Sequence, residues 1–133
     1  MRALPIVLLG AAAIGLAVAG SVATREPAIE GLIRCNGQHM LAVSWADEVD
    51  WEGRLIPRVQ RNRLAAAQAR LEARIMEAVP ASGMGVVEAM ASVEAMTAAQ
   101  VAEARERIEA RGLEAAVLET VAAAEACSPR HLR

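Results

Sequence analysis

The feature that most constrains this chain is the run at residues 3–23, twenty-one consecutive positions without a charge. As a helix that rises about 1.5 Å per residue, the run would be roughly 31 Å long, which matches the hydrocarbon core of a bilayer. Such a run either stays in the membrane as an anchor or is cleaved as a secretion signal. A buried helix of a soluble protein is a third alternative.

Two details bear on the choice between anchor and signal. The run ends in small-residue sites suited to signal peptidase, Ala17-Val18-Ala19 and Ser21-Val22-Ala23, and these favour cleavage. The segment before it contributes only Arg2 and the amino terminus, which is little charge for a cleaved signal and sets the membrane orientation weakly. Anchor and signal both place residues 24–133 outside the cytoplasm, and we expect a domain in the bacterial periplasm.

Residues 24–133 are enough for one small domain, which buries about two-thirds of its unfolded surface at best. Its core has to be built from small and aliphatic side chains, because the sequence has no Phe or Tyr and only two tryptophans, Trp45 and Trp51. All fourteen basic residues are Arg, and the net charge is −2. A nucleic-acid binder relies on neutralising phosphates, so we expect no nucleic-acid partner.

Two short helices are expected in the first part of this domain. One covers residues 28–34, with apolar residues at helical spacing, and the turn signal Asn36-Gly37 ends it. The other begins near Ser44, carries acids in its first turn and both tryptophans, and stops near Gly53.

Longer helices are expected in the remainder. Pro57 suits the first position of a helix that runs to about Val79. The break at residues 80–83 would send the next helix back antiparallel. The stripe of the first long helix, which should face a partner helix, consists of Leu64, Ala67, Leu71, Ile75 and Ala78.

A second apolar stripe starts at residue 86 and continues without interruption through Thr97, which favours one long helix over a new start at a capping box in residues 97–100. Gly112 shifts the phase, and a last helix to about Ala126 is closed by Pro129. No stretch alternates with a two-residue period, so the sequence predicts an all-α fold, either a small helical bundle or a long antiparallel helical hairpin. The second stripe, in which Met90 is assigned to the core, consists of Val86, Met90, Val93, Thr97, Val101, Ala104 and Ile108.

The most specific motif is a pair of Cys-x-x-x-His units, Cys35 with His39 and Cys127 with His131, which hold every cysteine and histidine of the chain. In an oxidising compartment, two cysteines favour a Cys35–Cys127 disulfide, and closing a loop of about 90 residues stabilises by roughly 4–5 kcal/mol. The alternative is a zinc site with all four residues as ligands, because thiolate and imidazole are the ligands that zinc prefers. A third alternative leaves the thiols unpaired.

Two groups of residues are candidates for contact with a partner or with lipid. The tryptophans lie six residues apart, so one of Trp45 and Trp51 is expected in the core and the other at a partner or membrane surface. The second group is a basic run that can meet acidic partners or anionic head groups, although acids just upstream can balance its charge: Arg54, Arg58, Arg61 and Arg63.

The sequence gives little support for catalysis. His39, Ser44 and Asp47 are the only close set that resembles a base, a nucleophile and an orienting acid, and no nucleophile elbow accompanies them. There is also no glycine-rich phosphate loop, and we see no sign of a small-molecule substrate. We therefore expect a protein that is not an enzyme.

Residues 96–100, Met-Thr-Ala-Ala-Gln, resemble the Leu-Thr-x-x-Gln signature of small periplasmic helical chaperones and metal-stress sensors. The resemblance covers five residues and has Met in place of Leu. It implies a chaperone or sensor role. The rival hypothesis, which rests on the paired motifs, is a metal-binding sensor with Cys35, His39, Cys127 and His131 as ligands. The leading hypothesis is a non-catalytic helical protein of the cell envelope that contacts another protein, contains the disulfide, and is tethered by residues 3–23 if these are retained.

Overall fold

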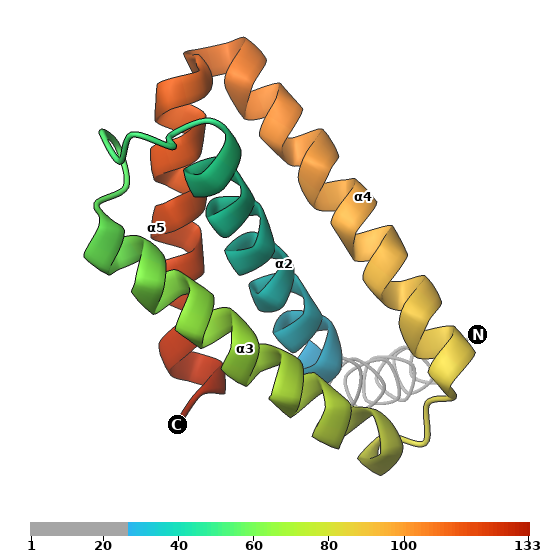
Figure 1. Ribbon diagram of the computed structural model, residues 1–133. Coiled ribbons are helices and arrows are strands. Elements are labelled where there is room, and N and C mark those ends of the chain that lie inside the picture. The colour runs from blue at the N-terminus through green and yellow to red at the C-terminus, as the bar shows by residue number, and fades with distance from the viewer. Residues whose placement is uncertain (1–26) are drawn as a thin grey trace, which may run out of the picture.

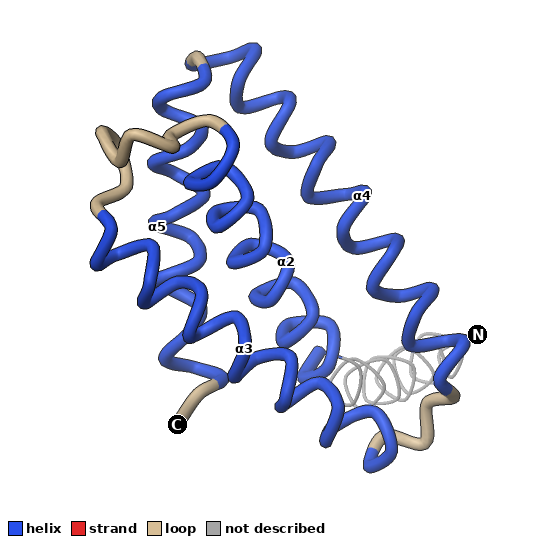
Figure 2. The backbone as a smooth tube through the Cα atoms, in the orientation of Figure 1, coloured by secondary structure: helices blue, strands red, loops and turns tan. Residues whose placement is uncertain are grey.

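The computed structural model describes residues 27–133, with side chains from Ile29 onward. Four helices make up nearly all of this range: α2 (Pro27–Glu48), α3 (Arg58–Ala81), α4 (Val86–Arg111) and α5 (Leu113–His131). No strand occurs among the described residues, so the predicted all-α class is confirmed for them (Figure 2). The predicted anchor or signal at residues 3–23 lies outside the described residues. From residue 27 onward, no helix combines the length and hydropathy that crossing a bilayer requires.

Helix α2 is the centre of the fold and packs against each of the other three helices. Helices α3 and α4 diverge from their shared turn and lie on either side of α2, while α5 returns alongside α2 (Figure 1). A small bundle therefore describes this arrangement. The alternative, a long hairpin with α3 and α4 side by side, does not.

The prediction of two short helices, at residues 28–34 and from Ser44 to near Gly53, is wrong. Helix α2 continues through Asn36-Gly37 and past Ser44 to Glu48, and residues 49–53 lie in a loop. Local turn propensity is a weak preference that tertiary packing overrides. Asn36 is buried, and the missing side chain of Gly37 leaves room for the carboxamide of Gln100 on α4. The glycine therefore allows a close approach of two helices.

Asp50 organises the loop between α2 and α3. Its carboxylate accepts hydrogen bonds from the backbone N–H groups of Arg54, Leu55 and Ile56, at 2.7–3.0 Å. These bonds place the Ile56 side chain in the core. Pro57 then precedes the first residue of α3, within one residue of the predicted start.

The predicted breaks between the later helices are close to the observed ones. Helix α3 extends two residues beyond Val79 and includes Pro80, and the chain turns at Gly83, which has a φ of 76°. Helix α4 runs unbroken through Thr97, as the apolar stripe predicts. Gly112, with a φ of 89°, separates α4 from α5 as expected, since glycine adopts positive φ without steric cost.

The predicted end of the last helix is wrong. Helix α5 passes Ala126 and contains Pro129 before it ends at His131. A proline in the last turn removes one backbone donor, and here the helix continues for two residues beyond it. As a result, Cys127, Ser128 and His131 all lie on one helix.

The core has two parts, one packed against the first half of α2 and the other against its second half. The smaller is formed by Leu32, Cys35 and Leu71, and the larger is formed by Ala42, Ala46, Ile56, Leu64, Val117, Val121 and Ala124. Leu64 and Leu71 are therefore buried as their stripe predicts. Met90 is not, since 61% of it is exposed, which corrects its assignment to the core.

Candidate functional site

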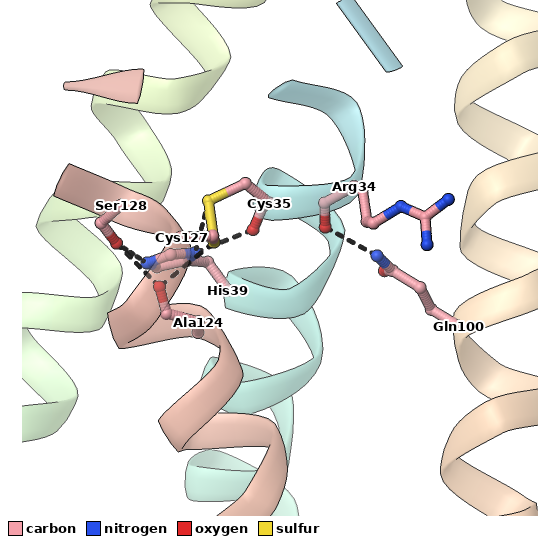
Figure 3. The surroundings of a disulfide bond; sticks show 7 residues. All are labelled: Arg34, Cys35, His39, Gln100, Ala124, Cys127 and Ser128. Atoms are coloured by element: carbon pink, nitrogen blue, oxygen red, sulfur yellow. Dashed lines mark hydrogen bonds between the residues drawn. A yellow bond between two sulfur atoms is a disulfide. The ribbon is translucent and has the colours of Figure 1, made fainter. Parts of the chain in front are cut away.

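A disulfide between Cys35 of α2 and Cys127 of α5 joins two helices whose cysteines are 92 residues apart in sequence (Figure 3). The sulfurs are 2.03 Å apart and the Cα atoms 5.7 Å, so the pairing expected from the sequence is present in the structure. Cys35 is 1% exposed and packs with Leu32 and Leu71. Cys127 is half-buried, so a reductant would approach the bridge from its side.

His39 lies one helical turn after Cys35 and is completely buried beside the disulfide. Its Nδ1 is 2.8 Å from the carbonyl oxygen of Cys35, and its Nε2 is 2.7 Å from the hydroxyl oxygen of Ser128. Figure 3 shows the imidazole between α2 and α5, with a partner on each helix. The ring therefore links the two helices at the same level as the disulfide.

The imidazole of His39 is neutral in this environment. Burial lowers its pKa below the usual value near 6.5, and the hydrogen bond to Cys35 and the negative charge of Glu125 oppose this only in part. A neutral ring has one N–H. Nδ1 carries it and donates to the Cys35 carbonyl, and Nε2 accepts from the hydroxyl of Ser128.

His131, the second histidine of the paired motifs, does not join this cluster. Its ring lies against Gly31, where an added Cβ would be 3.4 Å from the nearest ring atom. The ligand atoms of Cys35, His39 and Cys127 lie within 4.8 Å of one another. The structure therefore brings together three of the four proposed zinc ligands, and two of these are joined as a disulfide.

The possible catalytic set His39, Ser44 and Asp47 is not assembled. The hydrogen bonds of His39 go to Cys35 and Ser128, and Asp47 forms an ion pair with Arg61. Ser44 instead lines a small cavity beside α4. The three side chains thus serve different contacts.

Sequence reasoning missed Ser128, whose hydroxyl meets the imidazole of His39. Its position next to Cys127 is a signal that could have found it. A bridge between Cys127 and Cys35 brings Ser128 close to His39, which lies one helical turn after Cys35. A serine bonded to a histidine can act as a nucleophile with its base. Ser128 is followed by Pro129, however, which has no N–H to offer an oxyanion, and the pair is better explained as a structural contact.

A cleft of about 530 Å³ opens next to His39 and Ser128. Arg63 and Arg70 border it from α3, and Glu125 borders it from α5. The guanidinium of Arg70 donates to the carbonyl of Leu132, at 3.0 Å, so it is engaged by the end of the chain. The cleft gives small solutes and water a route to the neighbourhood of the imidazole.

The basic residues at 54–63 are divided between several contacts. Arg54 pairs with Glu52 at 2.6 Å, and Arg61 pairs with Asp47. Arg58 is exposed, and Arg63 borders the cleft. Exposed pairs contribute about 0–1 kcal/mol, and part of the cationic charge is balanced by the upstream acids. Contact with lipid or an acidic partner stays a prediction.

The two tryptophans have different environments, as expected, but they do not lie on opposite sides of one helix, because only Trp45 is helical. Trp45 is partly buried against the larger core. Trp51 lies beyond the end of α2 in the loop that follows and is 75% exposed. A role for Trp51 at a partner or membrane surface stays a prediction.

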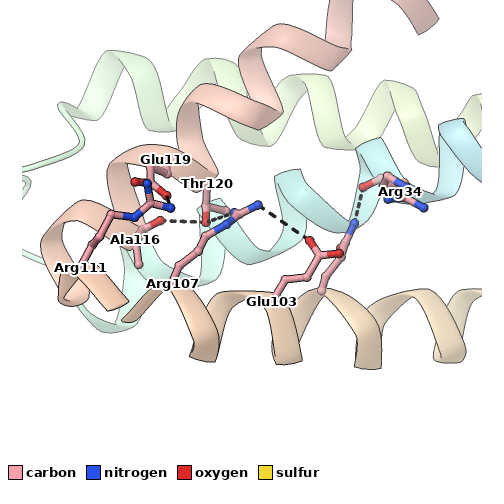
Figure 4. A network of polar contacts seen from close by, with 8 residues as sticks. Arg34, Glu103, Arg107, Arg111, Ala116, Glu119 and Thr120 are labelled. Carbon is pink, nitrogen blue, oxygen red and sulfur yellow. Dashed lines mark hydrogen bonds and ion pairs between the residues drawn. The ribbon is translucent and has the colours of Figure 1, made fainter. Parts of the chain in front are cut away.

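Polar contacts at the α4–α5 junction fix the position of α4 (Figure 4). Arg107 reaches Thr120 across the junction, at 3.4 Å, and Glu103 on its own helix, at 3.8 Å. Arg111 pairs with Glu119 at 2.8 Å. These contacts hold the end of α4 close to α5 while leaving its first turns less enclosed.

Residues 96–100 lie in the middle of α4. The hydroxyl of Thr97 donates to the carbonyl of Val93, and the carboxamide of Gln100 donates to the carbonyl of Arg34 on α2. Both polar residues thus have structural contacts.

No protein-family model, no curated protein and no solved structure matches the chain.

Proposed function

We propose that this chain is a small, non-catalytic helical protein of the bacterial cell envelope that acts by contacting another protein. Two observations support the location. Residues 3–23 have the length and lack of charge of a signal or anchor. The Cys35–Cys127 bridge is of a kind that persists in oxidising compartments and is rare in the cytosol.

The observation that carries the contact function is the mismatch between the apolar stripe of α4 and its buried face. The buried residues of α4 are Ala89, Gln100 and Ala104. At about 100° per residue, their mean direction is roughly 50° away from the centre of the stripe predicted from the sequence. Apolar side chains at the start of α4 are exposed, including Val86, Met90 and, at 82%, Val87.

This surface suits an amphipathic helix of a partner protein. Apolar residues at positions 86 and 90 are one turn apart, the spacing at which helical anchors pack into a groove or onto another helix. Exposed Val101 extends the same side farther along α4. The charged residues that follow in the second half of α4 would form a polar rim.

Site-specific photo-crosslinking in cells tests the contact function. A photoreactive amino acid at position 87 should crosslink to one other envelope protein, and Met90→Glu in the same chain should abolish that product. The matched control is position 59, since Val59 on α3 is exposed to a similar degree. Equal crosslinking from positions 59 and 87, or none from 87, would contradict the proposal.

The location is tested separately with a reporter phosphatase that becomes active only when its own disulfides form. The reporter is fused after residue 133 of the full chain. The control is the same fusion made with residues 24–133 alone. We expect activity only with the full chain. Activity without residues 3–23, or none with them, would rule out export by this segment.

A further inference from the structure

The disulfide and the neighbouring imidazole bring three metal-ligating groups into one buried cluster. The ligand atoms of Cys35, His39 and Cys127 lie within 4.8 Å of one another. Zinc binds thiolate sulfur at about 2.3 Å and imidazole nitrogen at about 2.0–2.1 Å. While the disulfide is intact, neither sulfur is a thiolate. Reduction would release both sulfurs as ligands next to a histidine that is already in place.

The separations suit one ion after a small movement. In a tetrahedral site with those bond lengths, a sulfur and a nitrogen ligand are roughly 3.5 Å apart, and two sulfurs roughly 3.8 Å apart. The Sγ of Cys35 and the Nδ1 of His39 are already 3.9 Å apart. The two sulfurs have to separate, which side-chain rotation of the half-buried Cys127 can provide. The Nδ1 of His39 also has to exchange its hydrogen bond to the Cys35 carbonyl, at 2.8 Å, for the metal.

The hydrogen bonds around His39 also satisfy the tautomer that a metal requires. A metal on Nδ1 leaves the proton on Nε2, which then donates to the hydroxyl oxygen of Ser128, at 2.7 Å. The hydroxyl in turn donates to the carbonyl of Ala124, at 2.9 Å. Ligating histidines usually donate their second N–H to such a partner, which fixes the ring. In the oxidised protein the Ser128 hydroxyl donates to Nε2 instead. Metal binding would therefore turn this hydroxyl toward the Ala124 carbonyl and leave the Cys35 carbonyl without its Nδ1–H donor.

We propose that reduction of the Cys35–Cys127 disulfide creates a site for a thiophilic divalent cation such as Zn²⁺, with the two sulfurs and His39 Nδ1 as ligands. The site excludes His131, which lies against Gly31. Three protein ligands leave the fourth position open. The half-buried Cys127 is the ligand from whose side water would approach that position. The proposal does not depend on the partner contact of α4.

The conversion requires two electrons, which a dithiol reductant supplies. One of its thiolates attacks the Sγ of Cys127, breaks the disulfide and releases Cys35 as a thiolate. The second thiol of the reductant attacks the resulting mixed disulfide, releases Cys127, and leaves the reductant as a cyclic disulfide. When the cation binds, any proton held by either cysteine passes to solvent.

Titration of the purified full chain with Co²⁺ in mild detergent, under anaerobic conditions, tests the site. The reduced and desalted chain should bind one Co²⁺ and develop both a thiolate charge-transfer band and the visible bands of tetrahedral cobalt. Zn²⁺ should displace the cobalt and remove these bands. The oxidised chain should show neither feature. Absence of the bands from the reduced chain, or equal bands from the oxidised chain, would overturn the proposal.

Two histidine variants separate a folded site from non-specific capture. His39→Ala should weaken cobalt binding by about tenfold or more, and His131→Ala should leave it unchanged. An equal loss in both variants would show that the cation binds an unfolded chain. If His39→Ala does not fold, as judged by circular dichroism, Ser128→Ala provides the test because it keeps all three ligands. It should weaken binding about tenfold or more, and an unchanged affinity would refute the role of His39.

Discussion

The carboxamide of Gln100 on α4 lies directly over the backbone of Gly37 on α2. Its Nε2 donates to the carbonyl of Arg34 at 2.6 Å (Figure 3). A Cβ on Gly37 would overlap the carboxamide. This contact explains why a turn-forming dipeptide lies inside a long helix. It also explains why a polar residue is buried on α4.

Gly37→Ala is expected to lower the free energy of unfolding despite the better helix propensity of alanine. The substitution gains about 1 kcal/mol of propensity, but it displaces Gln100 and leaves buried polar groups unpaired, at a cost of about 1–3 kcal/mol. The decisive measurement is a double-mutant cycle with Gln100→Ala in urea unfolding. The two changes should be non-additive by about 1 kcal/mol or more. Strict additivity would mean that the two residues do not interact.

Acidification should destabilise the oxidised protein through His39. Because burial lowers the pKa of the folded imidazole, the unfolded chain takes up a proton first as the pH falls below about 6.5. The free energy of unfolding should therefore decrease as the pH falls from about 6.5 to the lowered pKa, with a slope of at most about 1.4 kcal/mol per pH unit. Well above pH 6.5 it should not depend on this group. The experiment compares the pH dependence of urea unfolding in wild type and His39→Asn. The same slope in both proteins would assign the effect to other groups.

Loss of the disulfide should lower the free energy of unfolding by about 4–5 kcal/mol, because the bridge closes a loop of about 92 residues in the unfolded chain. Urea unfolding with and without a phosphine reductant measures the difference. The double variant Cys35→Ser, Cys127→Ser should be no more stable than the reduced wild type and should not respond to the reductant. A midpoint that does not move on reduction would contradict the expected contribution of the bridge.

Asp50→Ala should reduce the thermal midpoint more than Asp47→Ala does. Burial acts to raise the pKa of the Asp50 carboxyl, but the backbone N–H groups of Ile56, Leu55 and Arg54, together with the Arg54 charge, outweigh it and lower the pKa. The stabilisation by Asp50 should thus be present above the pKa of an unfolded aspartate and be lost in acid as pH falls through the lowered value. Thermal scans of both variants at neutral and acidic pH check this order. The difference in thermal midpoint between the two variants should disappear at acidic pH.

The tryptophans should report separately on core and surface. Trp51→Phe should leave stability within about 0.5 kcal/mol of wild type, with the remaining Trp45 emission shifted toward the blue and protected from iodide. Trp45→Phe should leave a red-shifted emission that iodide quenches readily. Fluorescence of the two single-tryptophan proteins measures both effects. Equal quenching would show that the environments do not differ.

Periodicity predicted the helix class and most helix ends, because apolar spacing and glycine or proline breaks act locally. It also placed Leu64 and Leu71 in the core correctly. It failed at Asn36-Gly37 and at Pro129, where residues with a strong local preference were retained in helices by contacts made far away in sequence. Periodicity also could not choose between a hairpin and a bundle, since that depends on which stripes meet.

The Cys35–Cys127 pairing was predicted from the presence of two cysteines and from the expected oxidising compartment. The groups beside the disulfide were not predicted. Of the four residues in the metal alternative, the structure groups Cys35, His39 and Cys127, and His131 lies against Gly31 instead. The two histidines have the same spacing from a cysteine, so the sequence could not distinguish them before the orientation of each helix was known. Ser128 was missed for the same reason. Its contact with His39 crosses 89 residues of sequence and requires α2 and α5 to be side by side.

The central pair of helices also sets an order for assembly during biosynthesis. Helix α2 is the first described helix to be made, and α5, its partner in the disulfide and in the larger core, is the last. Until α5 has left the ribosome, Val117, Val121 and Ala124 cannot complete the core around α2. Long-range contacts of this kind slow folding, so the earlier helices wait with apolar surface uncovered. A protein of this design is most exposed to proteases and chaperones before its last helix has been made.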